Sequence, residues 1–125
     1  MNLLLDTHVF LWAVSRPHAL SAAARKALQD PENRVLFSVV SAWEISIKKS
    51  LGKLDAPSDL RQILKLNDVE ELPLHLRHTE ALAGLAPLHR DPFDRMLVAQ
   101  ALADGLTLVT RDDILKRYGV PILSA

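Results

Sequence analysis

The sequence has 125 residues, hydrophobic residues make up 49% of it, and it contains no cysteine. This length predicts one domain, residues 1–125, with a substantial core, and the lack of cysteine excludes disulfides and thiolate metal sites. The formal net charge is zero, from 15 basic and 15 acidic residues. This counts against a nucleic-acid-binding protein, because such proteins usually have a basic surface. The apolar start lacks the basic region of a signal peptide, so we expect a cytoplasmic protein with no membrane association.

Short apolar strands and amphipathic helices are expected to alternate along the chain. In chain order, the pattern predicts a strand over 2–5, helices over 7–15 and 21–30, a strand over 34–40, helices over 41–53 and 58–66, a strand over 69–74, helices over 75–85 and 92–105, a strand over 106–110, a short helix over 112–119 and an extended segment over 120–123. This alternation predicts a three-layer α/β/α fold, Rossmann-like, with helices on both faces of a short central parallel sheet. The all-apolar strand "NLLL" belongs in its middle.

Four acidic residues fall at the ends of predicted strands or in the first turns of predicted helices. Asp6 directly follows the first strand, and Asp112 comes two residues after a later one. Glu44 and Asp94 lie in the first turns of the helices predicted to begin at 41 and 92. In an open α/β sheet these positions share one edge, so the fold is expected to bring the four carboxylates together.

Each of these acids also has a purely structural explanation. Ser41–Glu44 matches a capping box, S-x-x-E, and Thr110–Asp113 matches a looser one. Asp91–Asp94 fits a helix cap followed by an acidic first turn, and taken singly each of these explanations is favoured. Asp6 is harder to explain in this way, because a carboxylate at the end of an all-leucine strand is partly buried and needs a partner.

The stretch HRDPFDRMLVAQA, His89 to Ala101, suggests different roles for its two aspartates. Asp91 is expected to be the N-cap of the helix, with Pro92 in its first position. Asp94, one turn further on, is then free to point toward a site at the sheet edge.

The expected convergence of the four acids is the reason to assign them a role in catalysis. Carboxylates gathered at one edge repel each other unless cations neutralise them, and clusters of oxygen ligands suit Mg²⁺ or Mn²⁺. Two such ions, roughly 3.5–4 Å apart, can activate a water molecule and stabilise the leaving oxygen in phosphodiester hydrolysis. A mechanism of this kind needs no histidine, so His8 and His89 are expected to be structural in the main.

With these motifs in place, the sequence resembles the PIN domain family, and more narrowly the VapC-type ribonuclease toxins of toxin–antitoxin pairs. The resemblance covers essentially the whole chain and rests on LLLDTHVFLW, SVVSAWEISIKK, HRDPFDRMLVAQA and LTLVTRDDIL, in that order. It implies an endoribonuclease that depends on Mg²⁺ or Mn²⁺ and hydrolyses RNA phosphodiester bonds. The family's catalytic metal ligands match Asp6, Glu44, Asp94 and Asp112. Asp113 is the alternative to Asp112.

The resemblance also implies an RNA substrate, a homodimer and a cognate antitoxin whose tail inhibits the enzyme. Thr110 matches a polar family residue and is a candidate substrate contact, and Asp91 and Asp113 are helix caps or auxiliary residues. If two divalent ions neutralise the four acids, the net charge becomes mildly positive, so the neutral composition does not exclude RNA. Arg90, Arg95 and Arg111 lie beside the acidic motifs and are candidate phosphate contacts, although each is also explained as a solvated side chain.

Three other functions compete with this one. A receiver-type phosphoacceptor domain is disfavoured because Asp6 is followed by threonine and VEELPL leads to no aspartate. A haloacid-dehalogenase-like phosphatase requires D-x-D, where this chain has Asp6-Thr7-His8. A catalytically weak PIN-like module that binds RNA or protein stays the alternative, although none of the four acids is missing.

Overall fold

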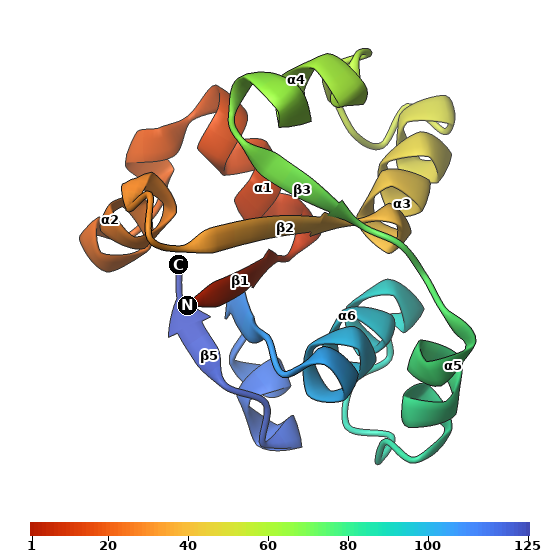
Figure 1. The fold of residues 1–125 in the computed structure, drawn as a ribbon. Helices are drawn as coiled ribbons and strands as arrows, with labels where there is room; N and C mark the ends of the chain where they lie inside the picture. Colours follow the sequence, from red (N-terminus) through yellow and green to blue (C-terminus); the bar gives the residue numbers. More distant parts are fainter.

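The computed structural model describes residues 1–125 and shows a five-stranded parallel sheet with helices on both faces (Figure 1). In chain order the elements are β1 (Asn2–Leu5), α1 (Thr7–Ser15), α2 (Ala22–Gln29), β2 (Arg34–Ser38), α3 (Val39–Ser50), α4 (Leu60–Leu66), β3 (Val69–Leu72), α5 (Leu76–Ala83), α6 (Pro92–Asp104), β4 (Thr107–Thr110) and β5 (Ile122–Ser124). Two 3-10 helices cover Pro17–Ala19 and Asp113–Tyr118. The strand order β3-β2-β1-β4-β5 places β1 in the centre, which confirms the predicted fold class.

The central strand β1 explains why its sequence is continuously apolar. Leu3 lies opposite Val35 of β2 on one side and Thr107 of β4 on the other, so β1 is paired along both edges. Leu3 and Leu5 belong to one hydrophobic cluster and Leu4 to the other. Because successive side chains of a strand point to opposite faces, a strand covered on both faces needs an apolar residue at every position.

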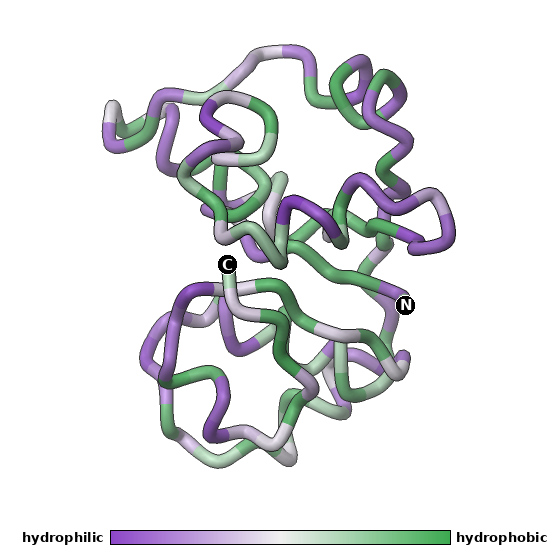
Figure 2. The backbone as a smooth tube through the Cα atoms, turned by 90° about the vertical axis from the view of Figure 1, so that its left-hand side faces the viewer, coloured by the Kyte–Doolittle hydropathy of each residue, from purple (hydrophilic) through white to green (hydrophobic).

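Two hydrophobic clusters flank the sheet. The first contains Phe10 of α1 and Phe37 of β2, whose rings lie 4.2 Å apart. The second contains Leu97 and Val98 of α6. Figure 2 shows hydrophobic segments gathered along the middle of the molecule, with hydrophilic segments mainly on the outer turns. None of the helices combines the length and the apolar content needed to cross a bilayer.

Several predicted helix boundaries are confirmed. Ser21 accepts a hydrogen bond from the backbone of Ala24 at the start of α2, and Asp59 caps α4. Asp91 is the N-cap of α6, and its Oδ1 accepts from the backbone N–H of Phe93 at 2.8 Å. Helix α6 ends at Gly105, which adopts a left-handed conformation with φ of 67°, as a C-terminal glycine allows.

The start of α3 differs from the prediction. Val39 and Val40 favour a strand locally, but β2 ends at Ser38, whose Oγ accepts from the backbone N–H of Val40 at 3.0 Å and begins the helix. The predicted capping box of Ser41 and Glu44 is therefore wrong, and Glu44 lies in the second turn of α3.

The capping box predicted for Thr110–Asp113 is also wrong. Thr110 is the last residue of β4, and Asp112 is the N-cap of the following 3-10 helix, with its Oδ1 accepting from the backbone N–H of Ile114. Asp113 is therefore the first residue of that helix, and the hydroxyl of Thr110 instead donates to Oδ2 of Asp6.

Candidate active site

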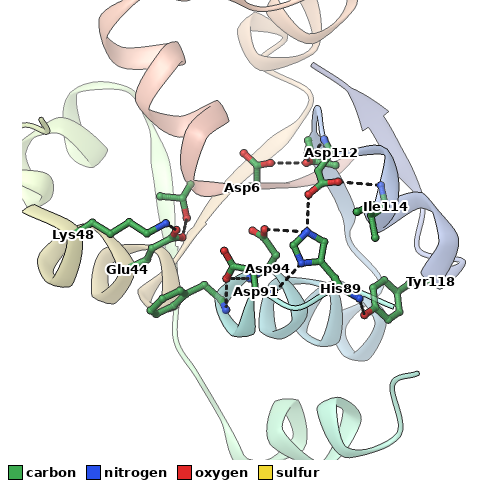
Figure 3. A network of polar contacts seen from close by, with 12 residues as sticks. Asp6, Glu44, Lys48, His89, Asp91, Asp94, Asp112, Ile114 and Tyr118 are labelled. Carbon is green, nitrogen blue, oxygen red and sulfur yellow. Dashed lines mark hydrogen bonds and ion pairs between the residues drawn. The ribbon is translucent and has the colours of Figure 1, made fainter. Parts of the chain in front are cut away.

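The four predicted carboxylates come together beyond the carboxyl ends of β1, β2 and β4 and at the start of α6. Figure 3 shows the side chains of Asp6, Glu44, Asp94 and Asp112 directed toward a shared space from four different elements. The negative charges of Asp6 and Glu44 both raise the pKa of Asp94. The sheet edge therefore gathers acids that are far apart in the sequence, as the order of the elements predicted.

Asp6 is the N-cap of α1 and is held on both of its oxygens. Its Oδ1 accepts from the backbone N–H of Val9 at 2.7 Å, and its Oδ2 accepts from Oγ1 of Thr110 at 2.5 Å. The residue is 7% exposed. Burial raises the pKa of Asp6, and the two hydrogen bonds only partly oppose this effect.

Glu44 is the most deeply buried acid of the cluster, with 2% exposure. Its Oε1 accepts a hydrogen bond of 2.6 Å from Oγ1 of Thr7, and its Oε2 pairs with the Lys48 ammonium. The hydrogen bond to Glu44 raises the pKa of Lys48. The sequence analysis missed Lys48, although a glutamate four residues before a lysine on a helix is a recognisable pairing signal.

Asp94 has little to balance its charge. No side chain or backbone group donates a hydrogen bond to the carboxylate of Asp94. The one ion-pair contact of this carboxylate is with Nε2 of His89 at 3.6 Å. Burial raises the pKa of Asp94 to about 7, with the charges of Asp91, Asp6 and Glu44 adding to the effect. A carboxylate in this state favours a cation that the protein itself does not supply.

Asp112 is paired with a histidine to which the sequence analysis gave little weight. Nε2 of His89 lies 2.7 Å from Oδ2 of Asp112, and ligand-type atoms of His89, Asp94 and Asp112 all lie within 4.8 Å of one another. The only sequence signal was the position of His89 two residues before Asp91. The side chain of Asp113, in contrast, is 85% exposed and pairs with Lys116 at 2.9 Å. The structure thus brings Asp112 into the cluster and leaves Asp113 outside it.

Thr110 links two of the acids. Its Oγ1 donates to Asp6 and accepts from the backbone N–H of Asp112 at 3.1 Å, and the residue is fully buried. A buried side chain that serves both acids is placed to hold them in position rather than to contact a substrate.

The three arginines predicted to contact phosphate have different surroundings. The guanidinium of Arg111 lies 4.2 Å above the ring of Trp12 and donates to the carbonyls of Ala19 and Ala125. Arg95 donates to the carbonyl of Leu85 at 3.3 Å.

Arg90 is exposed and forms no hydrogen bond or ion pair with the rest of the chain. Its guanidinium, unlike those of Arg95 and Arg111, is therefore available to a ligand. Phosphate contact by any of the three stays a prediction.

Comparison with known proteins shows the family to which this chain belongs. The family model described as "PIN domain" matches residues 3–121. The chain belongs to the PIN domain family. Ribonuclease VapC22 of Mycobacterium tuberculosis is 28% identical to this PIN domain over 124 residues, which cover 96% of this chain and 94% of the relative.

Solved structures show the same fold. VapBC2 from Rickettsia felis, bound to a DNA fragment from its promoter, aligns with a TM-score of 0.73 at 18% identity, covering 99% of this PIN domain and 98% of that chain. DNA-bound VapBC from Salmonella typhimurium aligns with a TM-score of 0.70 at 19% identity, with 99% and 98% coverage. The resemblance stated from the sequence motifs is confirmed.

Proposed function

We propose that this PIN domain, residues 1–125, is a metal-dependent endoribonuclease of the cytoplasm and the toxin of a type II toxin–antitoxin pair. The observation that carries the proposal is the excess of carboxylates at the sheet edge. Asp6, Glu44, Asp94 and Asp112 share one space, and Lys48 is the one lysine or arginine that forms an ion pair with any of them. The mycobacterial relative is named a ribonuclease, which supports the activity.

The residues at the sheet edge fit a divalent cation. The four acids offer carboxylate oxygens as metal ligands, and these are the ligands that Mg²⁺ and Mn²⁺ prefer. In the absence of a cation, burial and neighbouring charges raise the pKa of Asp94 to about 7. The charged form of Asp94 is therefore disfavoured until a cation supplies positive charge. When bound, the cation would supply positive charge that activates water and stabilises the phosphate during cleavage.

The protein's own residues position the acids for that role. Thr110 holds Asp6 and the backbone of Asp112, and Thr7 holds Glu44. Asp94 is left without a hydrogen-bond donor, so both of its oxygens are available. The proposed division of labour is that Asp91 caps α6 while Asp94, one turn later, binds the cation.

Arg90 is the arginine we propose for phosphate contact. It directly precedes Asp91 at the start of α6 and is exposed. Arg95 and Arg111 already donate to backbone carbonyls, so either would have to give up a hydrogen bond of the fold to bind RNA.

The test is RNA cleavage by purified protein, with labelled single-stranded RNA and total cellular RNA as substrates, in EDTA, in Mg²⁺ and in Mn²⁺. We expect cleavage only with a divalent ion, and cleavage slower by roughly 10²-fold or more with Asp94→Asn. Equal cleavage in EDTA, or full activity of the variant, would overturn the metal-dependent mechanism. Metal binding without cleavage of any RNA would favour the alternative of a catalytically weak binding module.

Protein partners are the second part of the proposal. Structures with this fold include toxin–antitoxin complexes, which supports a cognate antitoxin. The surface also leaves apolar side chains exposed, among them Trp43 at 59%, Leu51 at 61% and Leu76 at 73%. We propose that such surface is used by the antitoxin and by a homodimer. Light scattering of the purified chain, alone and with the product of an adjacent small reading frame, tests both.

A further inference from the structure

The imidazole of His89 lies between two of the acids. Its Nε2 is 2.7 Å from Oδ2 of Asp112 and 3.6 Å from Oδ2 of Asp94. Taken by distance alone, these three residues could form a mixed histidine–carboxylate metal site. The other nitrogen of the ring argues against that assignment.

The backbone fixes the tautomer of His89. Nδ1 of the ring accepts a hydrogen bond of 3.0 Å from the backbone N–H of Asp91. A backbone N–H is always a donor, so Nδ1 carries no proton and presents its lone pair. The neutral ring then has its proton on Nε2, which leaves Nε2 without a lone pair for a metal and makes it a donor to Asp112.

We propose that His89 is a positioning residue that stays outside the coordination shell of the cation and holds Asp112 in place beside Asp94. The inference rests on the metal site of the proposed function. It predicts that the cation is bound by oxygen ligands without a nitrogen ligand from His89. A site of that kind favours Mg²⁺ or Mn²⁺, whereas an imidazole ligand would shift the preference toward Zn²⁺.

The surroundings of the ring support a positioning role. The backbone N–H of His89 donates to the hydroxyl of Tyr118 at 2.9 Å. Tyr118 belongs to the 3-10 helix that Asp112 caps. His89 therefore joins the segment that leads into α6, the helix of Asp94, to the segment after β4, which carries Asp112.

A second histidine of the same chain shows this arrangement away from the cluster. Nδ1 of His78 accepts from the backbone N–H of His75 at 2.9 Å, and its Nε2 lies 2.9 Å from Oδ2 of Asp104. His78 is fully buried between α5 and α6. It supplies a matched control, because the same backbone-locked ring holds a carboxylate outside the proposed metal site.

The first experiment observes the proton directly. Nitrogen NMR of protein with ¹⁵N-labelled histidine, recorded without metal and then with Mg²⁺ and with Zn²⁺, reports which ring nitrogen is protonated. We expect Nε2 of His89 to keep its proton with Mg²⁺, as His78 does throughout. Loss of that proton when Mg²⁺ binds, with the His78 signals unchanged, would make His89 a ligand and overturn the proposal.

The second experiment separates the two nitrogens by substitution. His89→Gln keeps a donor near the position of Nε2, and His89→Asn keeps an acceptor near the position of Nδ1. We expect Mn²⁺ affinity, measured by calorimetry, to stay within about 3-fold for glutamine and to fall about 10-fold or more for asparagine and for His89→Ala, the range typical of residues that orient metal ligands. His78→Gln should leave Mn²⁺ affinity unchanged.

Two results of these substitutions would count against the proposal. Asparagine preserving Mn²⁺ affinity as well as glutamine would show that the ring only supports the backbone. Equal losses for all three substitutions, with Zn²⁺ affinity falling more than Mn²⁺ affinity, would show that His89 ligates. Circular dichroism and thermal melts establish that each variant is folded. A parent protein that binds Mn²⁺ but cuts no RNA would sink the proposed function and leave the assignment of His89 standing.

Discussion

The two histidine–carboxylate pairs of this protein have nearly the same geometry and opposite electrostatic surroundings. In the pair between α5 and α6, Asp104 contacts His78 and also receives hydrogen bonds from Arg77, which lower the pKa of Asp104. In the pair at the sheet edge, Asp112 contacts His89 beside Asp94, and burial raises the pKa of Asp94 to about 7. The contacts match, but only the first pair has an arginine.

The two pairs differ in the feature that separates the candidate metal site from a purely structural pair. A histidine that holds a carboxylate is found in both places, so the pair itself identifies nothing. The difference lies in the balance of charge, because Asp104 is neutralised by Arg77 within the protein and Asp94 is not. Buried acids without a compensating cation are a reason to look for a ligand that brings one.

The largest expected contrast is between Asp94→Asn and Asp104→Asn. Asp94→Asn should reduce RNA cleavage by roughly 10²-fold or more if the cation supplies several kcal/mol of transition-state stabilisation. Its metal-free melting temperature should stay level or rise, because one member of a repelling cluster is removed. Asp104→Asn should lower the melting temperature and leave cleavage intact. Cleavage assays and melts of both variants check this, and a dead Asp104→Asn that is fully folded would contradict the comparison.

Lys48→Met should cost the metal-free protein about 1–3 kcal/mol, because it leaves the buried Glu44 without its charged partner. Mn²⁺ should raise the melting temperature of this variant more than that of the parent, since the ion replaces the lost positive charge. Lys116→Met is the control, because its partner Asp113 is exposed and an exposed pair contributes little. Equal destabilisation by the two substitutions would show that Glu44 does not depend on Lys48.

The pH dependence of stability should have opposite signs in the two regions. Between the unfolded pKa of an aspartate, about 3.9, and the folded pKa of Asp94, about 7, the folded protein keeps a proton that the unfolded chain has released. The contribution of Asp94 to metal-free stability therefore falls as pH rises through this window. Asp104, whose pKa is lowered, contributes stability that is lost as pH falls through its folded pKa.

Urea unfolding in EDTA at several pH values measures these slopes. Asp94→Asn should reduce the fall in the free energy of unfolding as the pH rises toward 7. Asp104→Asn should leave this fall unchanged. Mn²⁺ affinity should rise with pH up to about 7, because the ion competes with the proton on Asp94. A parent and an Asp94→Asn variant with the same slope would show that Asp94 does not hold this proton.

The smallest expected effect is that of Asp91→Asn. Asparagine caps a helix about as well as aspartate, so both the melting temperature and the cleavage rate should change little. The charge of Asp91 raises the pKa of Asp94. The substitution should therefore lower that pKa and move the rise of Mn²⁺ affinity to a lower pH. Loss of cleavage in a well-folded Asp91→Asn beside an active Asp94→Asn would reverse the roles proposed for the two aspartates.

The sequence by itself determined the architecture and the set of acids. The all-leucine strand at 2–5 predicted the centre of the sheet, and the alternation of elements predicted parallel strands whose carboxyl ends share one edge. Asp91 and Gly105 marked the limits of α6. These features are readable because periodicity, capping and burial act over a few neighbouring residues. The start of α3 differs from the prediction because two such signals compete there, the β-branched Val39–Val40 favouring a strand and the capping hydroxyl of Ser38 favouring a helix.

Only the tertiary structure decided how the acids are held. The hydrogen bond from Thr110 to Asp6 joins residues 104 positions apart, and the contact of His89 with Asp112 spans 23 positions. Asp112 and Asp113 are adjacent and chemically identical, yet one caps a helix at the cluster while the other faces solvent. Such differences depend on strand order and on the direction in which each side chain leaves the backbone. Local composition carries neither, because both arise from contacts between segments that are distant in the chain.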